Sequence, residues 1–156
     1  MFKIETGDNN EILRTKSQEI ARIELNKYVK LGKQMIDYLK NPDNGGVGLA
    51  APQIGINKRI IAVSLMNSYE DENYRTIMMI NPEILEHSNN VEVDGEGCLS
   101  LPGESGEVER YCRIKLQFLD QKGHKNTIIL KGLSARIVQH EIDHLDGILF
   151  MDRVEK

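Results

Sequence analysis

The sequence predicts an α+β fold in which antiparallel β-sheets wrap around a central helix, with a second helix on the surface near the N-terminus. Three observations support this prediction. Apolar residues recur at helical spacing over residues 24–40, several short β-branched runs follow, and a second helical pattern over residues 134–145 carries two histidines. The 156 residues suit one domain with a real core, so we expect residues 1–156 to form a single catalytic domain.

The N-terminal third of the chain is expected to be irregular over residues 1–16 and helical over residues 24–40. In the helix, Leu25 and Val29, and again Met35 and Leu39, stand four residues apart, with charged residues on the other face. The turn-forming cluster at residues 41–46 ends it.

Residues 46–55 form a small, apolar, glycine-rich segment that lacks the motifs of a phosphate-binding loop. On composition alone, a tight turn between helix and sheet is the favoured interpretation.

Strands are expected over residues 59–65, 76–80, 91–93, 113–119 and 126–131, where β-branched or alternating apolar residues recur. The last two flank a turn signal at residues 120–124, so they are expected to pair as an antiparallel hairpin. The final helix should end at Gly147.

The composition limits the function classes. A formal net charge of −4 argues against a nucleic-acid binder, because phosphate neutralisation needs a basic face. No apolar run approaches the roughly 20 residues of a membrane span, and the N-terminus lacks the apolar core of a signal peptide. The two cysteines, Cys98 and Cys112, are therefore expected to stay reduced in the cytoplasm.

The C-terminal helix carries the strongest chemical signal. His140 and His144 lie on one face of a helix and can bind a single divalent cation, while Glu141 beside them can move protons for a metal-bound water. The long zinc-peptidase motif HExxHxxGxxH places a third His where this chain has Phe150, and the downstream Glu155 is too close to the C-terminus to serve.

A third ligand is therefore expected upstream of the helix. Cys98 is favoured, because a thiolate is a strong ligand for a borderline-soft metal. His87 and His124 stand in polar, turn-like stretches and are expected to be exposed histidines. Cys112 is expected to be a partly buried structural residue.

Three segments together resemble the signature motifs of the peptide deformylases: GVGLAAPQ at 46–53, EGCLS at 96–100 and QHEIDH at 139–144. The resemblance implies a hydrolase that removes the formyl group from the N-terminal formyl-methionine of newly synthesised proteins. It also implies one divalent metal ion per chain, Fe(II) as the physiological ion, with Zn, Ni or Co able to occupy the site.

The resemblance also implies roles for individual residues. Cys98, His140 and His144 bind the metal, and Glu141 shuttles the proton. The side-chain amide of Gln53 and the backbone N–H of Leu99 stabilise the oxyanion, while main-chain groups of Val47, Gly48 and Gly97 hold the substrate. From position alone, Leu133, Arg136 and Ile137 are candidate walls for the methionine side chain.

The expected partners are N-formyl-methionyl nascent peptides, with the ribosome as a further candidate partner and no membrane. The chain stops soon after Asp152, where many relatives continue into a C-terminal helix, which weakens the expectation of ribosome docking.

Three alternatives remain at this point: a zinc peptidase, a metal-stabilised binding module, and an α+β domain with unligated histidines. Cys98 counts against the first alternative, and Glu141 with Gln53 counts against the second. The joint presence of the three motifs counts against the third.

Overall fold

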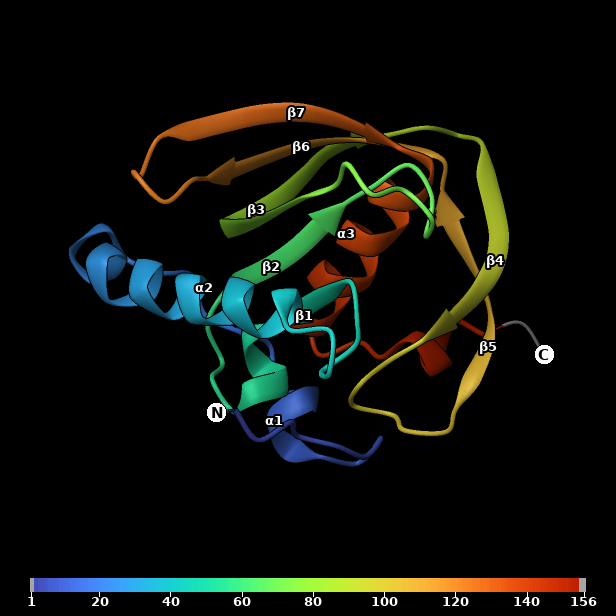
Figure 1. Ribbon diagram of the computed structural model, residues 1–156, viewed down its shortest axis with the longest axis horizontal. Coiled ribbons are helices and arrows are strands. Elements are labelled where there is room, and N and C mark those ends of the chain that lie inside the picture. Colours follow the sequence, from blue (N-terminus) through green and yellow to red (C-terminus); the bar gives the residue numbers. More distant parts are fainter. Residues whose placement is uncertain (1, 155–156) are drawn as a thin grey trace.

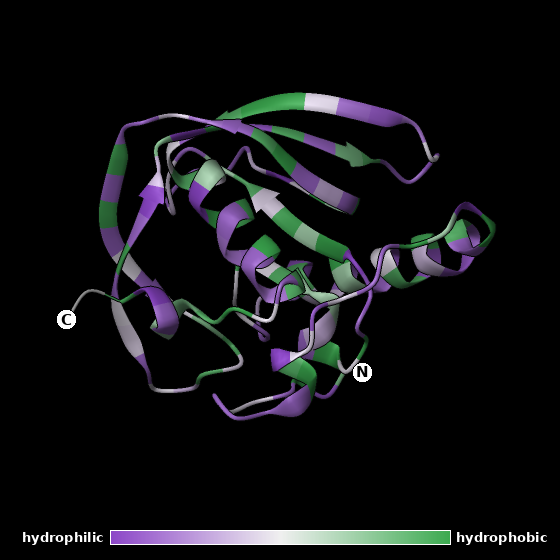
Figure 2. Cartoon of the chain, turned by 180° about the vertical axis from the view of Figure 1, so that it is seen from behind, coloured by the Kyte–Doolittle hydropathy of each residue, from purple (hydrophilic) through white to green (hydrophobic). Residues whose placement is uncertain are grey.

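The C-terminal helix α3, Gly132–Leu145, lies at the centre of the molecule (Figure 1). The computed structural model describes residues 2–154 of the chain. Every residue of α3 from Ser134 onward is buried. Purple and green alternate along the helix in Figure 2, so the centre of the protein contains polar as well as apolar side chains.

The molecule has two antiparallel sheets beside its helices, so the expected α+β class is confirmed. The larger sheet has the order β1-β2-β3-β6-β7 and the smaller one pairs β4 with β5. Their bounds are β1 Gly48–Ala50, β2 Ile60–Leu65, β3 Arg75–His87, β4 Val91–Gly97, β5 Ser105–Tyr111, β6 Arg113–Leu119 and β7 Lys125–Lys131.

Strand β2 separates two apolar layers, because its side chains alternate between the two faces of the sheet. Ile61 and Val63 belong to the cluster that includes α3. Ile60 and Ala62 belong to the cluster that includes α2, Leu25–Lys40. The two helices therefore cover opposite faces of the larger sheet, and the expected surface helix is confirmed.

The remaining helical segments are short: α1, Glu11–Arg14, and the 3-10 turns Arg22–Glu24, Ala51–Ile54 and Phe150–Arg153. The expectation of an irregular start was wrong over α1, where the Asn10 side chain accepts hydrogen bonds from the N–H groups of Ile12 and Leu13. Within residues 2–154, no helix has the length and apolar character needed to cross a bilayer.

Strand predictions failed where polar residues enter the sheets. Strand β5 was not expected, because its inward-facing position Arg110 is buried as an ion pair and breaks the apolar alternation. Strand β3 continues well past Ile80, through an irregularity in its register with β6 at which Asn81 takes a positive φ of 50°. The predicted hairpin of β6 and β7 is confirmed.

The glycine-rich segment is not a simple turn. It forms β1 at the edge of the larger sheet, then a 3-10 turn that ends at Gly55 with a φ of 86°. The N-terminal segment lies across it: the Glu5 N–H donates to the Gln53 carbonyl (2.7 Å), and the Gly7 N–H donates to the Ser100 carbonyl (3.0 Å). Residues from the start of the chain thus connect two of the three motif segments.

Candidate metal centre and active site

Near the C-terminal end of α3, His140 and His144 lie one turn apart with ring centroids separated by 5.1 Å. Both side chains are buried. Phe150, which stands where the longer zinc-peptidase motif has its third His, is also buried, and its ring stacks on that of His140 with centroids 6.1 Å apart. Phe150 thus packs behind the histidines, and a third donor has to come from another element.

Cys98, which follows β4, lies where such a donor is needed. Its Sγ lies 3.3 Å from His144 Nε2, and one donor atom from each of Cys98, His140 and His144 lies within 4.8 Å of the others. One thiolate and two imidazoles form a suitable ligand set for a divalent transition metal, and three protein ligands leave a further position open. Within residues 2–154, this is the one group of His, Cys and acidic side chains close enough to hold an ion.

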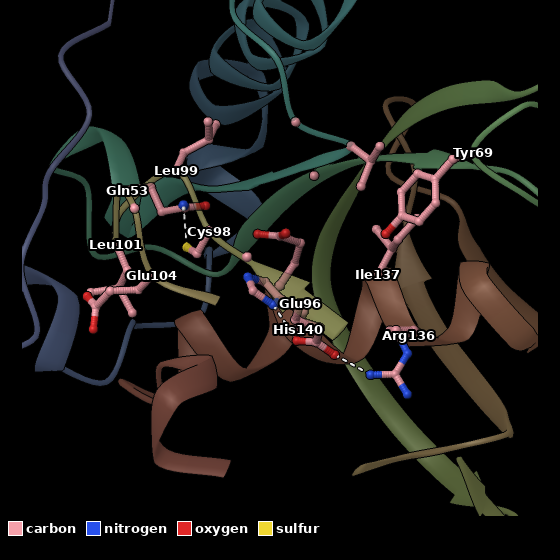
Figure 3. A pocket seen from close by; sticks show the side chains of 16 residues that line it. Gln53, Tyr69, Glu96, Cys98, Leu99, Leu101, Glu104, Arg136, Ile137 and His140 are labelled. Carbon is pink, nitrogen blue, oxygen red and sulfur yellow. Dashed lines mark hydrogen bonds and ion pairs between the residues drawn. The ribbon is translucent and has the colours of Figure 1, made fainter. Parts of the chain in front are cut away.

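Glu96 fixes the orientation of His140. Its Oε1 lies 2.9 Å from His140 Nδ1, which leaves Nε2 for the ligand cluster (Figure 3). Arg110 donates to both oxygens of Glu96, and Arg136 donates to Oε2 at 2.6 Å. Burial raises the pKa of Glu96, but Arg110 and His140 outweigh it and hold the pKa well below its usual range. Glu96 therefore stays charged.

The two histidines differ in their electrostatics. Burial lowers the pKa of His140, but the nearby Cys98 and Glu96 side chains raise it to about 10. Burial lowers the pKa of His144 well below its usual value, so this imidazole is neutral. The electron-rich neighbours that stabilise a proton on His140 would equally stabilise a metal cation bound to the same imidazole. The donor set and its surroundings therefore fit a bound metal.

Glu141 points into the same site against the backbone of β1. A Cβ placed on Gly48 would lie 2.5 Å from Glu141 Oε2, so only glycine lets the strand approach this closely. Within residues 2–154, the buried Oε1 atom of Glu141 has no hydrogen-bond partner. Burial raises the pKa of this carboxyl to about 7. The side chain can therefore take up and release a proton near neutral pH.

Gln53 is held by both ends of its amide. Oε1 accepts a hydrogen bond from the Ala50 N–H (2.9 Å), which is the turn-capping role considered from the sequence. Nε2 lies 3.1 Å from Ser100 Oγ and 3.6 Å from Cys98 Sγ, on the side of the ligand cluster. Leu99 directly follows Cys98 in the chain, and within residues 2–154 its N–H has no backbone acceptor. Two N–H donors thus lie beside Cys98.

A cavity of about 570 Å³ opens over these groups. It is lined by eight of the expected site residues, listed in chain order as Val47, Gly48, Gln53, Gly97, Cys98, Leu99, His140 and Glu141; the ninth, His144, is buried and is not part of the lining. The cavity is bordered by β1 and β4, each of which is the last strand on one side of its sheet among the described residues. It therefore lies between two strand edges that can accept another strand.

The remaining candidate residues from the sequence differ in whether they line the cavity. Arg136 and Ile137 line the cavity, whereas Leu133 is absent from the lining and packs against the apolar core. His87 and His124 are exposed, as expected, although His87 belongs to β3 rather than to a loop. Cys112 is half-buried.

Two contributors were missed from the sequence. Glu96 stands two residues before Cys98, and strand alternation could have placed the two side chains on one face. Tyr69, from the polar loop between β2 and β3, also lines the cavity, and no sequence pattern indicated it.

Comparisons with known proteins agree with this site. Residues 1–156 match the family described as Polypeptide deformylase. A peptide deformylase of Natranaerobius thermophilus is 42% identical over 154 residues, which cover 99% of this chain and 92% of that protein.

Solved structures show the same similarity. A probable peptide deformylase from Synechococcus phage S-SSM7 has a TM-score of 0.85 at 41% identity, over 98% of this chain and 99% of that one. The Met-Ala-Ser-bound class I type b peptide deformylase from Acinetobacter baumannii has a TM-score of 0.87 at 35% identity, over 99% of this chain and 98% of that one. The chain therefore belongs to the polypeptide deformylases, the metallo-hydrolases that remove N-formyl groups from nascent peptides.

Proposed function

We propose that Cys98, His140 and His144 hold one divalent cation, and that the formyl group of a formyl-methionyl peptide is hydrolysed beside it to release formate. The observation that carries this proposal is the convergence of one thiol and two imidazoles beside a buried carboxyl with an unpaired oxygen. When bound, the cation supplies a water molecule acidified to a pKa of about 7. We propose Fe(II) as the native ion, with Zn, Ni or Co able to replace it; α3 is then the central metal-binding helix.

Glu141 is the proposed proton carrier. It takes a proton from the water whose oxygen bonds to the formyl carbon, and it delivers that proton to the amine nitrogen as the C–N bond breaks. A pKa near 7 suits a group that must both accept and donate in one cycle at neutral pH. The close contact with Gly48 limits how far the carboxyl can turn, so the proton moves between fixed positions.

Gln53 and Leu99 are the proposed oxyanion donors. The Ala50 N–H holds the amide oxygen of Gln53, which keeps Nε2 on the side of Cys98. The Leu99 N–H follows the same cysteine. Such preorganised donors lie where negative charge develops on the formyl oxygen, and one of them is typically worth about 3–4 kcal/mol in the transition state.

The substrate peptide is proposed to add as a strand between β1 and β4. Main-chain groups of Val47 and Gly48 on one side and of Gly97 on the other would hold its backbone. The relative from Acinetobacter baumannii was solved with Met-Ala-Ser bound, which supports a peptide ligand here. The peptide backbone would provide the affinity, and a pocket for the side chain of the first substrate residue would provide the selectivity.

Three broader proposals accompany the site. Residues 1–156 would form one catalytic domain, because α3 packs against strands of the larger sheet and pairs through its side chains with the smaller one. The enzyme would act in the cytoplasm on nascent chains. Contact with the ribosome itself remains a candidate partnership, to be tested by cosedimentation.

The proposal is tested by formate release from formyl-Met-Ala-Ser, using protein purified without oxygen and loaded with Fe(II) or Ni(II). Wild type should release formate, and Glu141→Ala should lose at least about 100-fold in kcat, because the proton carrier is gone. Glu107→Ala, an exposed acid on β5, is the matched control and should keep full activity. A wild type that released no formate with either metal would refute the proposed hydrolysis.

Metal analysis forms the second arm of this experiment. Cys98→Ser should change the metal content or selectivity of the purified protein, because it replaces a thiolate by a weaker oxygen donor. Cys112→Ser, the other cysteine, should leave both unchanged. If Cys98→Ser bound the same ion with the same stoichiometry and affinity, a different third ligand would have to be sought.

A further inference from the structure

Tyr69 is an aromatic side chain in the loop that joins β2 to β3. It is 66% exposed and yet lines the active-site cavity. Figure 3 shows its ring above Ile137 at the end of the cavity near Arg136, on the far side of His140 from Gln53 and Leu101. An aromatic ring that is largely exposed leaves apolar surface available to a ligand. Tyr69 is therefore placed to contact a substrate.

The loop that carries Tyr69 has a defined structure. The Ser134 hydroxyl on α3 donates a buried hydrogen bond to the Met66 carbonyl (2.9 Å), which anchors the start of the loop to the central helix. Within the loop, the Asp71 carboxylate accepts from the N–H groups of Asn67 (3.0 Å) and Asn73 (2.9 Å). The backbone of the loop is thus braced on both sides of Tyr69, whose side chain lines the cavity.

The cavity is lined along α3 by His140, Ile137 and Arg136, and Tyr69 lies at the Arg136 end (Figure 3). We refer to this part of the cavity, between His140 and Tyr69, as the slot. His140 and Arg136 are one turn apart, so the slot runs for about 6 Å along the helix axis from the ligand cluster. Val47 and Ile137 contribute apolar side chains along it. This length and lining suit one unbranched apolar side chain, and a thioether would end near the ring, where sulfur–aromatic contacts are favourable.

We infer that Tyr69 is a specificity-determining residue, the end wall of the slot that receives the side chain of the first substrate residue. The inference rests on the proposed position of the formyl group beside Cys98, His140 and His144. Burial and the nearby Asp94 and Glu96 raise the pKa of the Tyr69 phenol. The ring therefore stays neutral, and the charged Arg136 and Glu96 that also line the cavity pair with each other at 2.6 Å.

The test compares kcat/KM for formyl-Met-Ala-Ser and formyl-Phe-Ala-Ser with the metal-loaded enzyme. In Tyr69→Ala, kcat/KM for the methionine peptide should fall about 2- to 10-fold, mainly through KM, because the aromatic contact is lost. Removal of the tyrosine ring should make room for the bulkier phenylalanine side chain, so the preference for methionine should fall roughly 10-fold or more. Tyr69→Phe keeps the ring and should keep the preference.

Tyr74→Ala is the matched control. Tyr74 stands at the other end of the same loop, is 45% exposed and does not line the cavity, so its removal should leave the preference unchanged. An active Tyr69→Ala enzyme with the wild-type preference would overturn the inference while leaving the deformylase site intact. Changed selectivity only at the third substrate position would also overturn it, since residues 1 and 3 of an extended peptide share a face. Absence of formate release by wild type would instead refute the proposed function itself.

Discussion

Buried charges on the two sides of α3 differ in whether they have partners. Toward the smaller sheet, Arg110 pairs with Glu96 at 2.8 Å and with Asp143 at 2.5 Å, and Arg153 adds a second partner for Asp143. Toward β1, within residues 2–154, the buried atom Glu141 Oε1 has no partner. The paired groups hold the scaffold, whereas the unpaired carboxyl is kept ready to react at a cost in stability.

Removing the ion pairs of Arg110 should have the largest effect on stability. Arg110→Met would leave Glu96 and Asp143 buried with fewer counter-charges, which typically costs 3–5 kcal/mol. Urea unfolding at pH 7 measures the loss. Arg113→Met, on the exposed face of β6, is the control and should change stability by no more than about 0.5 kcal/mol. Equal losses in both variants would show that the buried cluster has no special structural role.

Neutralising the unpaired Glu141 carboxylate should instead increase the free energy of unfolding. The pKa of Glu141 is raised from 4.5 to about 7 by burial, so between these values the native state binds more protons than the unfolded state. Stability therefore falls as pH rises from about 4.5 to 7, and the penalty is complete above pH 7. Each pKa unit corresponds to about 1.4 kcal/mol, so the penalty is about 3 kcal/mol.

Glu141→Gln removes that penalty while keeping the shape of the side chain. In the presence of a chelator, the variant should be about 3 kcal/mol more stable than wild type at pH 8, and the gain should vanish near pH 4. Chemical denaturation across this pH range measures it, with Glu107→Gln as the exposed control. A gain independent of pH would mean that ionisation of Glu141 is not its source.

The smallest effect is expected at the outer end of the paired cluster. Arg153 pairs with the same carboxylate as Arg110, but its side chain is 44% exposed. Water can replace the lost partner, so Arg153→Ala should cost no more than about 1 kcal/mol. Thermal unfolding beside Arg110→Met would check this ordering. A cost at Arg153 equal to that at Arg110 would contradict the role assigned to burial.

The accuracy of the sequence predictions followed the type of side chain involved. Strands β2, β6 and β7 and helix α2 were predictable because apolar periodicity follows directly from burial. Strand β5 was not, because its buried position holds Arg110, whose partners come from distant segments.

The candidate site shows the same limit. The ligand residues stand in recognisable motifs, and the structure brings Cys98, His140 and His144 together. Tyr69 lies in a polar loop whose sequence is typical of exposed turns, and only the fold places it over the cavity. A residue that reaches the site only through tertiary contacts has no local sequence pattern that predicts its position.

The position of α3 has a consequence for how the enzyme is made. All seven strands precede this helix in the chain, yet it fills the space between the two sheets (Figure 1). Neither the apolar layer around Ile61 and Val63 nor the ligand cluster can close until the final helix has left the ribosome. Folding dominated by such distant contacts is slow and late. Each new copy should therefore acquire activity only after α3 has been synthesised and has left the ribosome.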